Sequence, residues 1–203
     1  MSNNNRNGFV IGITGGIACG KSEVGRILEN MGFAILDTDV LAHGLMRKGS
    51  PVHQEIVARF GEHILSDDGE IFRPVLGKIV FDDLEKRALL NRLVHPAVRS
   101  ELDQWIGERR SGGQRAAGLV PLLFESAMQD LDWDATICVS SREPLVVQRL
   151  EERGLDSTEA RQRINAQMPL ADKEALADAV IRNNGTRREL ELAVRETVEA
   201  MMG

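Results

Sequence analysis

Val10-Ile-Gly-Ile-Thr-Gly-Gly-Ile-Ala-Cys-Gly-Lys-Ser22 decides the fold, because it ends in Gly-x-x-x-x-Gly-Lys-Ser, the pattern of a phosphate-binding loop. The apolar run over residues 9–13 predicts a buried strand before the loop, and the apolar spacing over residues 24–31 predicts a helix after it. Glycines let successive backbone N–H groups point inward, and the helix adds the positive end of its dipole. The sequence therefore predicts a phosphate site, with Lys21 on the β- and γ-phosphates and Ser22 on Mg²⁺.

Composition restricts the class of protein. A chain of 203 residues suits one domain of ordinary size, or a core domain with insertions, and 42% apolar with 28% charged residues is typical of a globular protein. The net charge of −6 argues against a nucleic-acid surface. No stretch approaches the roughly 20 apolar residues of a membrane span, and the polar start, which we expect to fray, lacks a signal peptide's apolar core. We therefore expect a cytoplasmic protein with no membrane or nucleic-acid partner, of unspecified oligomeric state.

Two cysteines, Cys19 and Cys138, fall in the phosphate loop and in a predicted buried strand. This placement predicts neither a disulfide framework nor a metal cluster. We interpret Cys19 as a small side chain that fits the tight loop, with a redox role as the alternative.

A second short strand, over residues 33–36, delivers the acidic pair Asp37 and Asp39. At the carboxyl end of a strand in an open parallel sheet, such residues line the ligand crevice. We therefore expect the pair to face the phosphates, placed for metal or proton chemistry. The structural alternatives are a turn residue for Asp37 and the N-cap of the next helix for Asp39.

Residues 44–110 have helical periodicity and no strand pattern. A helix over about residues 84–94 is predicted to stop at His95, because proline disfavours helix at the preceding residue, and Pro96 is expected to begin the next helix. An insertion of this length, between the second and third strands, is where many small-molecule kinases bind the acceptor. His95 is accordingly either an acceptor ligand or a histidine satisfied within the core.

Three more strands follow, one ending near Pro121 and the others over residues 135–139 and 179–181. The alternation of strands and helices predicts an α/β fold, a doubly wound five-stranded parallel sheet of the P-loop NTPase kind, with two helical excursions. A predicted helical hairpin after the fourth strand carries five arginines within residues 142–163. Arginines suit the neutralisation of charge on a transferring phosphoryl group; the alternative is a solvated face paired with glutamates.

Taken together, the motifs resemble those of the dephospho-CoA kinase family, in the family's order from residue 10 to about 185. They are the phosphate loop, Asp37-Thr38-Asp39 with His43, Phe60-Gly61, Asp68-Gly69, Val80-Phe81, His95-Pro96, Pro121 to Glu125, Arg163 with Gln167, Lys173, Ala177-Asp178, and Asn183 with Gly185. The resemblance implies transfer of the ATP γ-phosphate to the ribose 3′-hydroxyl of dephospho-CoA, the last step of coenzyme A synthesis, with ATP and Mg²⁺. It also implies a nucleotide-binding core (residues 1–43, 111–148 and 171–203), a helical acceptor (CoA) domain (44–110) and a helical lid (149–170).

The resemblance further implies roles for individual residues. Asp39 would orient or deprotonate the acceptor hydroxyl, and Lys21 and Arg149 would act with it in catalysis. The ATP contacts would be Gly16, Ile17, Ala18, Cys19, Gly20, Lys21, Ser22, Glu23, Arg149, Arg153 and Asn183. The acceptor contacts would be Asp37, His43, Phe81, His95 and Leu122. The magnesium ligands would be Ser22 and Asp39.

Three other functions compete with this hypothesis. A GTPase-type switch is disfavoured, because the chain has no Asn-Lys-x-Asp guanine-reading segment. Another small-molecule or nucleoside monophosphate kinase is the nearer alternative, since only the pocket fixes the acceptor. A non-catalytic nucleotide-binding scaffold is the third.

Overall fold

The computed structural model describes residues 8–203, and the polar start, for which fraying is predicted, lies outside them. The chain divides into two compact units, the first made of the residues up to Asp37 together with Asp103–Gly203, and the second of Thr38–Leu102. The division into core, acceptor domain and lid stays a prediction. No helix within residues 8–203 has both the length and the apolar character needed to cross a membrane.

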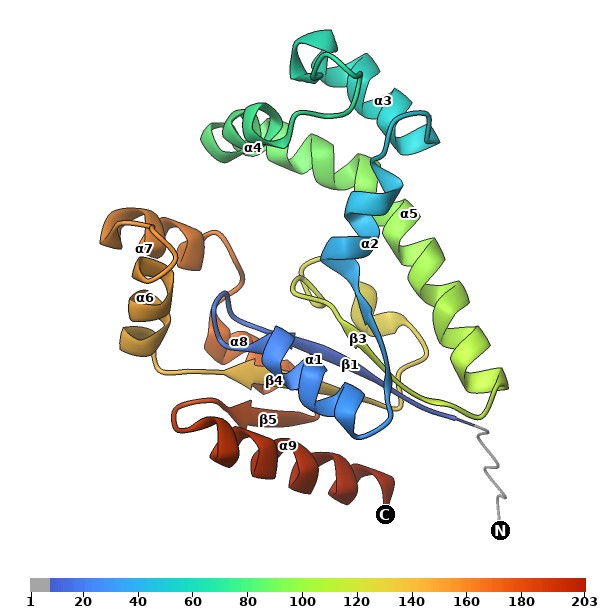
Figure 1. Ribbon diagram of the computed structural model, residues 1–203, viewed down its shortest axis with the longest axis vertical. Helices are drawn as coiled ribbons and strands as arrows, with labels where there is room; N and C mark the ends of the chain where they lie inside the picture. The colour runs from blue at the N-terminus through green and yellow to red at the C-terminus, as the bar shows by residue number, and fades with distance from the viewer. Residues whose placement is uncertain (1–7) are drawn as a thin grey trace. The chain divides into compact units, whose positions relative to one another are not determined.

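A five-stranded parallel sheet forms the centre of the first unit, in the order β2-β3-β1-β4-β5 (Figure 1). Its strands are β1 (Phe9–Gly15), β2 (Ala34–Asp37), β3 (Arg115–Leu119), β4 (Ala135–Ser140) and β5 (Ala179–Arg182). The central strand β1 is a nearly continuous apolar run because both of its faces are covered. The predicted α/β fold with five parallel strands is confirmed.

Helices pack on both faces of this sheet. Helices α1 (Lys21–Asn30) and α9 (Arg187–Met202) contact its strands, and α8 (Leu170–Leu176) contacts β1 and β4. Helices α6 (Glu143–Glu151) and α7 (Ser157–Asn165) contact each other, and the short 3-10 helix η2 (Met128–Asp130) precedes β4. Helices α1 and α9 contact each other and pack on the face formed by Ile11 and Ile13 (Figure 1). Side chains alternate along a strand, so Thr14 faces the opposite side, where both Thr14 and Lys173 of α8 donate hydrogen bonds to Pro121 O.

The second unit is helical, as predicted. It contains α2 (Thr38–Leu45), α3 (Pro51–Phe60), the 3-10 helix η1 (Glu62–Ile64), α4 (Arg73–Asp82) and the first part of α5 (Leu84–Ser111). Ser50 caps α3 by accepting a hydrogen bond from His53 N at 3.0 Å. Ile56, Ile64 and Leu102 are fully buried and form part of its small core.

The prediction that the helix stops at His95-Pro96 is wrong, because α5 runs unbroken through Pro96. A proline inside a helix costs about 3 kcal/mol. Val94, Val98 and Leu102 share one face around this point, and all are buried. Since burial of such a side chain contributes about 1.5 to 3 kcal/mol, packing of this face outweighs the local cost.

The structural alternative in which Asp39 is the N-cap of the next helix is wrong. Strand β2 ends at Asp37 and α2 begins at Thr38, so Asp39 lies inside the first helical turn. A carboxylate there still interacts favourably with the helix dipole.

Candidate active site

The phosphate loop connects β1 to α1 and requires glycine at two points. Gly15 (φ 141°) and Gly20 (φ 104°) adopt backbone conformations that side chains rarely allow. A Cβ atom on Gly15 would collide with Val139 O, and one on Gly20 would collide with the Asn183 side chain. The loop therefore has one tightly determined shape.

Lys21 is the first residue of α1, and its side chain folds back over the loop. Its Nζ donates hydrogen bonds to Gly15 O and Gly16 O, both at 2.9 Å. The ammonium group is thus held against the loop, which is the position from which such a lysine reaches bound phosphates.

The residues here fit a magnesium ion. Ser22 is exposed, and its hydroxyl group makes no hydrogen bond within residues 8–203. Asp37 and Ile13 both pair with Leu119, so Asp37 lies at the same edge of the sheet as the loop. The described part of the chain contains no group of three or more His, Cys, Asp or Glu side chains that could hold a metal ion by themselves. An ion here would take few protein ligands and complete its shell with phosphate and water, as Mg²⁺ usually does.

Side chains from α6 and from the residues directly after β4 and β5 hold the back of the loop. Arg149 Nη1 donates to Ala18 O at 3.1 Å and to Ser141 Oγ at 3.0 Å, and its Nη2 donates to Asn183 O at 3.1 Å. Asn183 Nδ2 donates to Cys19 O at 2.9 Å, and Ser141 Oγ donates to Asn183 O at 2.7 Å. The structure thus brings Arg149 and Asn183 together, with both bonded to loop carbonyl groups. Our sequence analysis gave Ser141 no part in this site, although its place directly after β4 is a usable signal.

A second set of contacts ties the segment after α7 to the loop and to the end of β3. Ile17 N donates to Gln167 Oε1 at 3.0 Å, and Met168 N donates to Glu125 Oε1 at 3.1 Å. Lys173, at 0% exposure, places its Nζ 2.7 Å from Glu125 Oε1 and 2.8 Å from Pro121 O. Glu125, Gln167 and Lys173 belong to the motifs of the resemblance, but the sequence analysis gave them no role.

Both cysteine thiols lie in surroundings that keep them neutral. Burial raises the pKa of Cys19, although Lys21 opposes the shift. Burial, with a further contribution from Glu174, raises the pKa of Cys138 to about 12. Neither is in a disulfide. The thiolate is the reactive form of cysteine, so this environment favours a packing role for Cys19.

A cavity of about 430 Å³ lies beside the loop. Its lining includes Ile17, Ser141, Val146, Ile164 and Leu170. Its volume is within the range of small-molecule sites, and the mostly apolar walls suit an aromatic base.

Three predicted site residues of the first unit lie outside these networks. The Glu23 carboxylate pairs with Arg26 at 2.9 Å and with Arg187 at 2.8 Å. Arg153 is exposed in the turn after α6. The carbonyl oxygen of Leu122, in the turn after β3, accepts hydrogen bonds from Ser126.

The predicted acceptor residues of the second unit lie on three helices. His43, on α2, lines a cavity of about 600 Å³ within this unit. Phe81, on α4, is 47% exposed and is not among the residues lining that cavity. His95, on α5, is half-buried, and burial lowers the pKa of its ring below the ordinary value.

Comparison with known proteins identifies the family. The family model for dephospho-CoA kinase matches residues 9–189. The chain belongs to the dephospho-CoA kinase family. It is 43% identical over 178 residues to the dephospho-CoA kinase of Carboxydothermus hydrogenoformans, covering 87% of this chain and 86% of that one. It is 45% identical over 187 residues to that of Geobacillus kaustophilus, covering 89% and 90%. The family predicted from the sequence motifs is thereby confirmed, and the chain is a phosphotransferase.

Two solved structures share the fold of this chain. A protein from Thermus thermophilus superposes with a TM-score of 0.76 at 30% identity, covering 96% of this chain and 98% of that one. Dephospho-CoA kinase from Campylobacter jejuni gives a TM-score of 0.72 at 24% identity, with 96% and 97% covered, which is a likeness of fold.

Proposed function

We propose that this protein transfers the γ-phosphate of ATP to the ribose 3′-hydroxyl of dephospho-CoA, giving CoA and ADP in the last step of coenzyme A synthesis. The observation that carries the proposal is the family match over residues 9–189. A fully formed phosphate loop supports it, because phosphoryl transfer depends mainly on positioning and on neutralisation of charge.

The nucleotide site in this proposal is the loop with its neighbours. The backbone N–H groups of residues 16–23 and the Lys21 ammonium bind the phosphates, and the apolar cavity beside Ile17 receives the adenine. Arg149 and Arg153 add positive charge from α6 and the turn after it. Asn183 acts by holding Cys19 O of the loop, and Ser141 acts by holding the carbonyl oxygen of Asn183.

Magnesium belongs to the same proposal. Ser22 would hold the ion, with carboxylate oxygen from Asp39 and support from Asp37, since oxygen ligands suit Mg²⁺. When bound, it neutralises charge on the β- and γ-phosphates.

Asp39 is the proposed catalytic carboxylate. A carboxylate is a far weaker base than a ribose alkoxide, so Asp39 orients the hydroxyl group and accepts its proton late, in keeping with a loose transition state. His43, Phe81, His95 and Leu122 complete the proposed acceptor contacts. In this account residues 44–110 form the acceptor domain and 149–170 a lid that excludes water. The proposed compartment is the cytoplasm, and no nucleic-acid or membrane partner is proposed.

The test is coupled ADP production with dephospho-CoA, compared with a panel of nucleosides and shikimate. Shikimate belongs in the panel because a shikimate kinase from Acinetobacter baumannii shares the fold, with a TM-score of 0.55 at 17% identity. We expect dephospho-CoA to give the highest kcat/KM. The proposal fails if dephospho-CoA is not phosphorylated and another acceptor is.

A further inference from the structure

The peptide group that joins Gly16 to Ile17 is held on two opposite edges by side chains. Its carbonyl oxygen, Gly16 O, accepts a hydrogen bond from Lys21 Nζ at 2.9 Å. Its N–H group, on Ile17 N, donates a hydrogen bond to Gln167 Oε1 at 3.0 Å. In a trans peptide the C=O and N–H bonds point in opposite directions. Lys21 and Gln167 therefore clamp one peptide plane of the phosphate loop between them.

Hydrogen bonds have to fix this plane, because Gly16 has no side chain to limit rotation of the backbone. Cys19 N also donates to Gly16 O, at 3.3 Å, and so acts on the same edge as Lys21. Gln167 Oε1 holds the opposite edge. If this partner were lost, the plane could rotate, and the oxygen atom that holds the Lys21 ammonium group would move with it.

Gln167 is itself held in place from both sides along the chain. Its own N–H group donates to Ile164 O at 3.3 Å, at the end of α7. The next N–H group, on Met168, donates to Glu125 Oε1 at 3.1 Å. Glu125 is fixed in turn by the fully buried Lys173, whose Nζ lies 2.7 Å away. The Gln167 side chain thus starts from a backbone anchored to the segment after β3.

The orientation of the Gln167 carboxamide follows from its partner. Ile17 N–H can only donate, so the oxygen atom of the carboxamide has to face it. The Nε2 atom makes no hydrogen bond within residues 8–203, and Gln167 lines the cavity beside the loop. The side chain can therefore act in two ways: through Oε1 on the loop, or through Nε2 on a ligand in the cavity.

We infer that Gln167 is a positioning residue for phosphoryl transfer, which acts through Oε1: it fixes the Gly16–Ile17 peptide group, and that peptide group fixes the Lys21 ammonium group. The inference rests on the proposed role of Lys21 at the phosphates of ATP, and it gives a function to a residue for which the sequence analysis gave none. A charge that is held still before reaction stabilises the transition state more than one that must reorient.

Steady-state kinetics of Gln167→Leu test this inference. The change keeps a side chain of similar size but removes the acceptor, so kcat should fall by about 10-fold, with KM for dephospho-CoA unchanged. Gln162→Leu is the matched control, because it makes the same change at an exposed position of α7 and should keep kcat.

Gln167→Glu separates the two ends of the carboxamide. It keeps an acceptor oxygen and loses the NH₂ donors, so it should recover most of the kcat that Gln167→Leu loses. A glutamate variant as impaired as the leucine variant would assign the function to Nε2 and overturn the inference.

A double-mutant cycle with Lys21→Ala tests whether Gln167 acts through the lysine. Residues that act as a unit are not additive. Once the ammonium group is absent, Gln167→Leu should lower the residual kcat by less than about twofold. A full tenfold loss in the Lys21→Ala background would show that Gln167 acts elsewhere, and the inference would be wrong.

Hydrogen exchange of the Ile17 amide, followed by NMR, examines the clamp without turnover. Exchange should be about 10-fold faster in Gln167→Leu than in wild type and should return towards the wild-type rate in Gln167→Glu. Gln162→Leu should leave the rate unchanged. Equal exchange rates in wild type and Gln167→Leu would overturn the inference.

The inference and the proposed function can fail separately. If wild type phosphorylates dephospho-CoA while Gln167→Leu keeps kcat, the positioning role is overturned and the proposed function stands. If wild type phosphorylates a different acceptor of the panel, and Gln167→Leu lowers kcat for that acceptor and speeds exchange of the Ile17 amide, the proposed function is overturned and the positioning role stands.

Discussion

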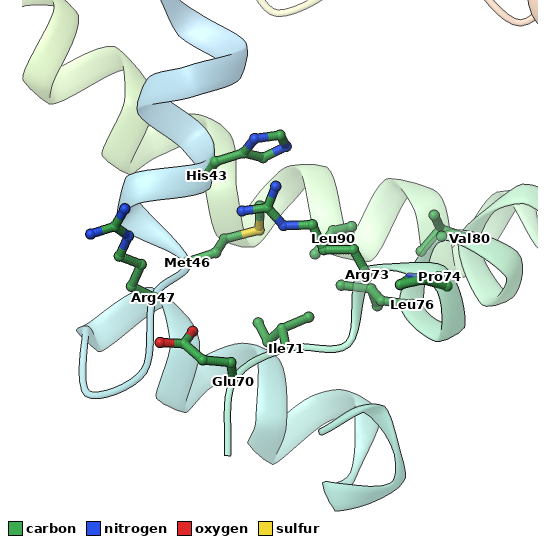
Figure 2. A pocket seen from close by; sticks show the side chains of 11 residues that line it. His43, Met46, Arg47, Glu70, Ile71, Arg73, Pro74, Leu76, Val80 and Leu90 are labelled. Atoms are coloured by element: carbon green, nitrogen blue, oxygen red, sulfur yellow. The ribbon is translucent and has the colours of Figure 1, made fainter. Parts of the chain in front are cut away.

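The phosphate loop and the cavity of about 600 Å³ within the second unit (Figure 2) present positive charge in opposite ways. At the loop, Lys21 and Arg149 are bonded to loop carbonyl groups, and Asn183 holds Cys19 O from a distant part of the chain. In the cavity, Arg47 and Arg73 are without such partners in the described residues. Fixed donors stabilise a transition state because they need little reorganisation during reaction. Unpaired guanidinium groups favour affinity for an incoming anion. We therefore expect the phosphoryl-transfer chemistry at the loop.

Lys21→Ala should have the largest effect. It removes the ammonium group that lies against Gly15 O and Gly16 O and that we propose as the phosphate contact, so kcat/KM should fall by about 10³-fold. Thermal unfolding of the variant checks that the fold is intact. A fall of less than tenfold would contradict the assignment of chemistry to the loop.

Lys173→Met tests how strongly the loop surroundings are anchored. It leaves Glu125 and Pro121 O without their buried cation, so the free energy of unfolding should fall by about 3 kcal/mol. The control is Arg195→Met, which breaks an exposed pair with Glu191 at 3.8 Å and should cost less than about 1 kcal/mol. If chemical denaturation gives the same loss of unfolding free energy for both variants, the buried pair contributes no more to stability than the exposed one.

The strands were predictable because each is a short apolar run between turn signals, and the parallel topology followed from their alternation with helices. The contacts at the back of the loop could not be predicted, because Arg149 and Ala18 are 131 positions apart in sequence, and Asn183 and Cys19 are 164 apart. Local sequence patterns do not predict contacts between residues so far apart. The continuity of α5 was missed for the same reason, since the burial of Val98 and Leu102 outweighs the local effect of Pro96.

The cavity within the second unit shows a further limit of prediction from sequence. Periodicity gave the helices of this unit, but it does not say where two apolar faces leave a space between them. Arg73 begins α4, and Arg47 follows α2. Only the packed unit shows that both line one cavity.

Asp39→Asn tests the proposed catalytic role of Asp39, which belongs to the second unit. It removes the negative charge that we propose to orient the acceptor hydroxyl, so kcat should fall by about two orders of magnitude. ATP binding, measured by calorimetry, should persist. Near-normal turnover would remove Asp39 from the catalytic role and shift attention to Asp37.

The smallest effect is the one that we expect Cys138 to have on the stability of the fold at high pH. The ordinary pKa of a cysteine thiol is 9.0, whereas burial raises the pKa of Cys138 in the folded protein to about 12. Above pH 9 the folded state therefore keeps a proton that the unfolded state has lost. Stability is therefore fully present below pH 9 and decreases as pH rises towards 12. Between pH 8 and pH 10 this thiol should account for about 1 kcal/mol of the loss. Cys138→Ala should show a shallower decline in urea denaturation at the two pH values; an unchanged decline would refute the effect. The chain has no tyrosine, so phenol groups do not complicate the comparison.

The most direct test of the central claim is the identity and stoichiometry of the products formed from ATP and dephospho-CoA. Wild type should form CoA and ADP in equal amounts, with ³¹P NMR showing a new phosphomonoester at the ribose 3′ position. Lys21→Ala should form little of either product at any concentration of acceptor. ADP released without CoA, or phosphate found on a different hydroxyl group, would contradict the account.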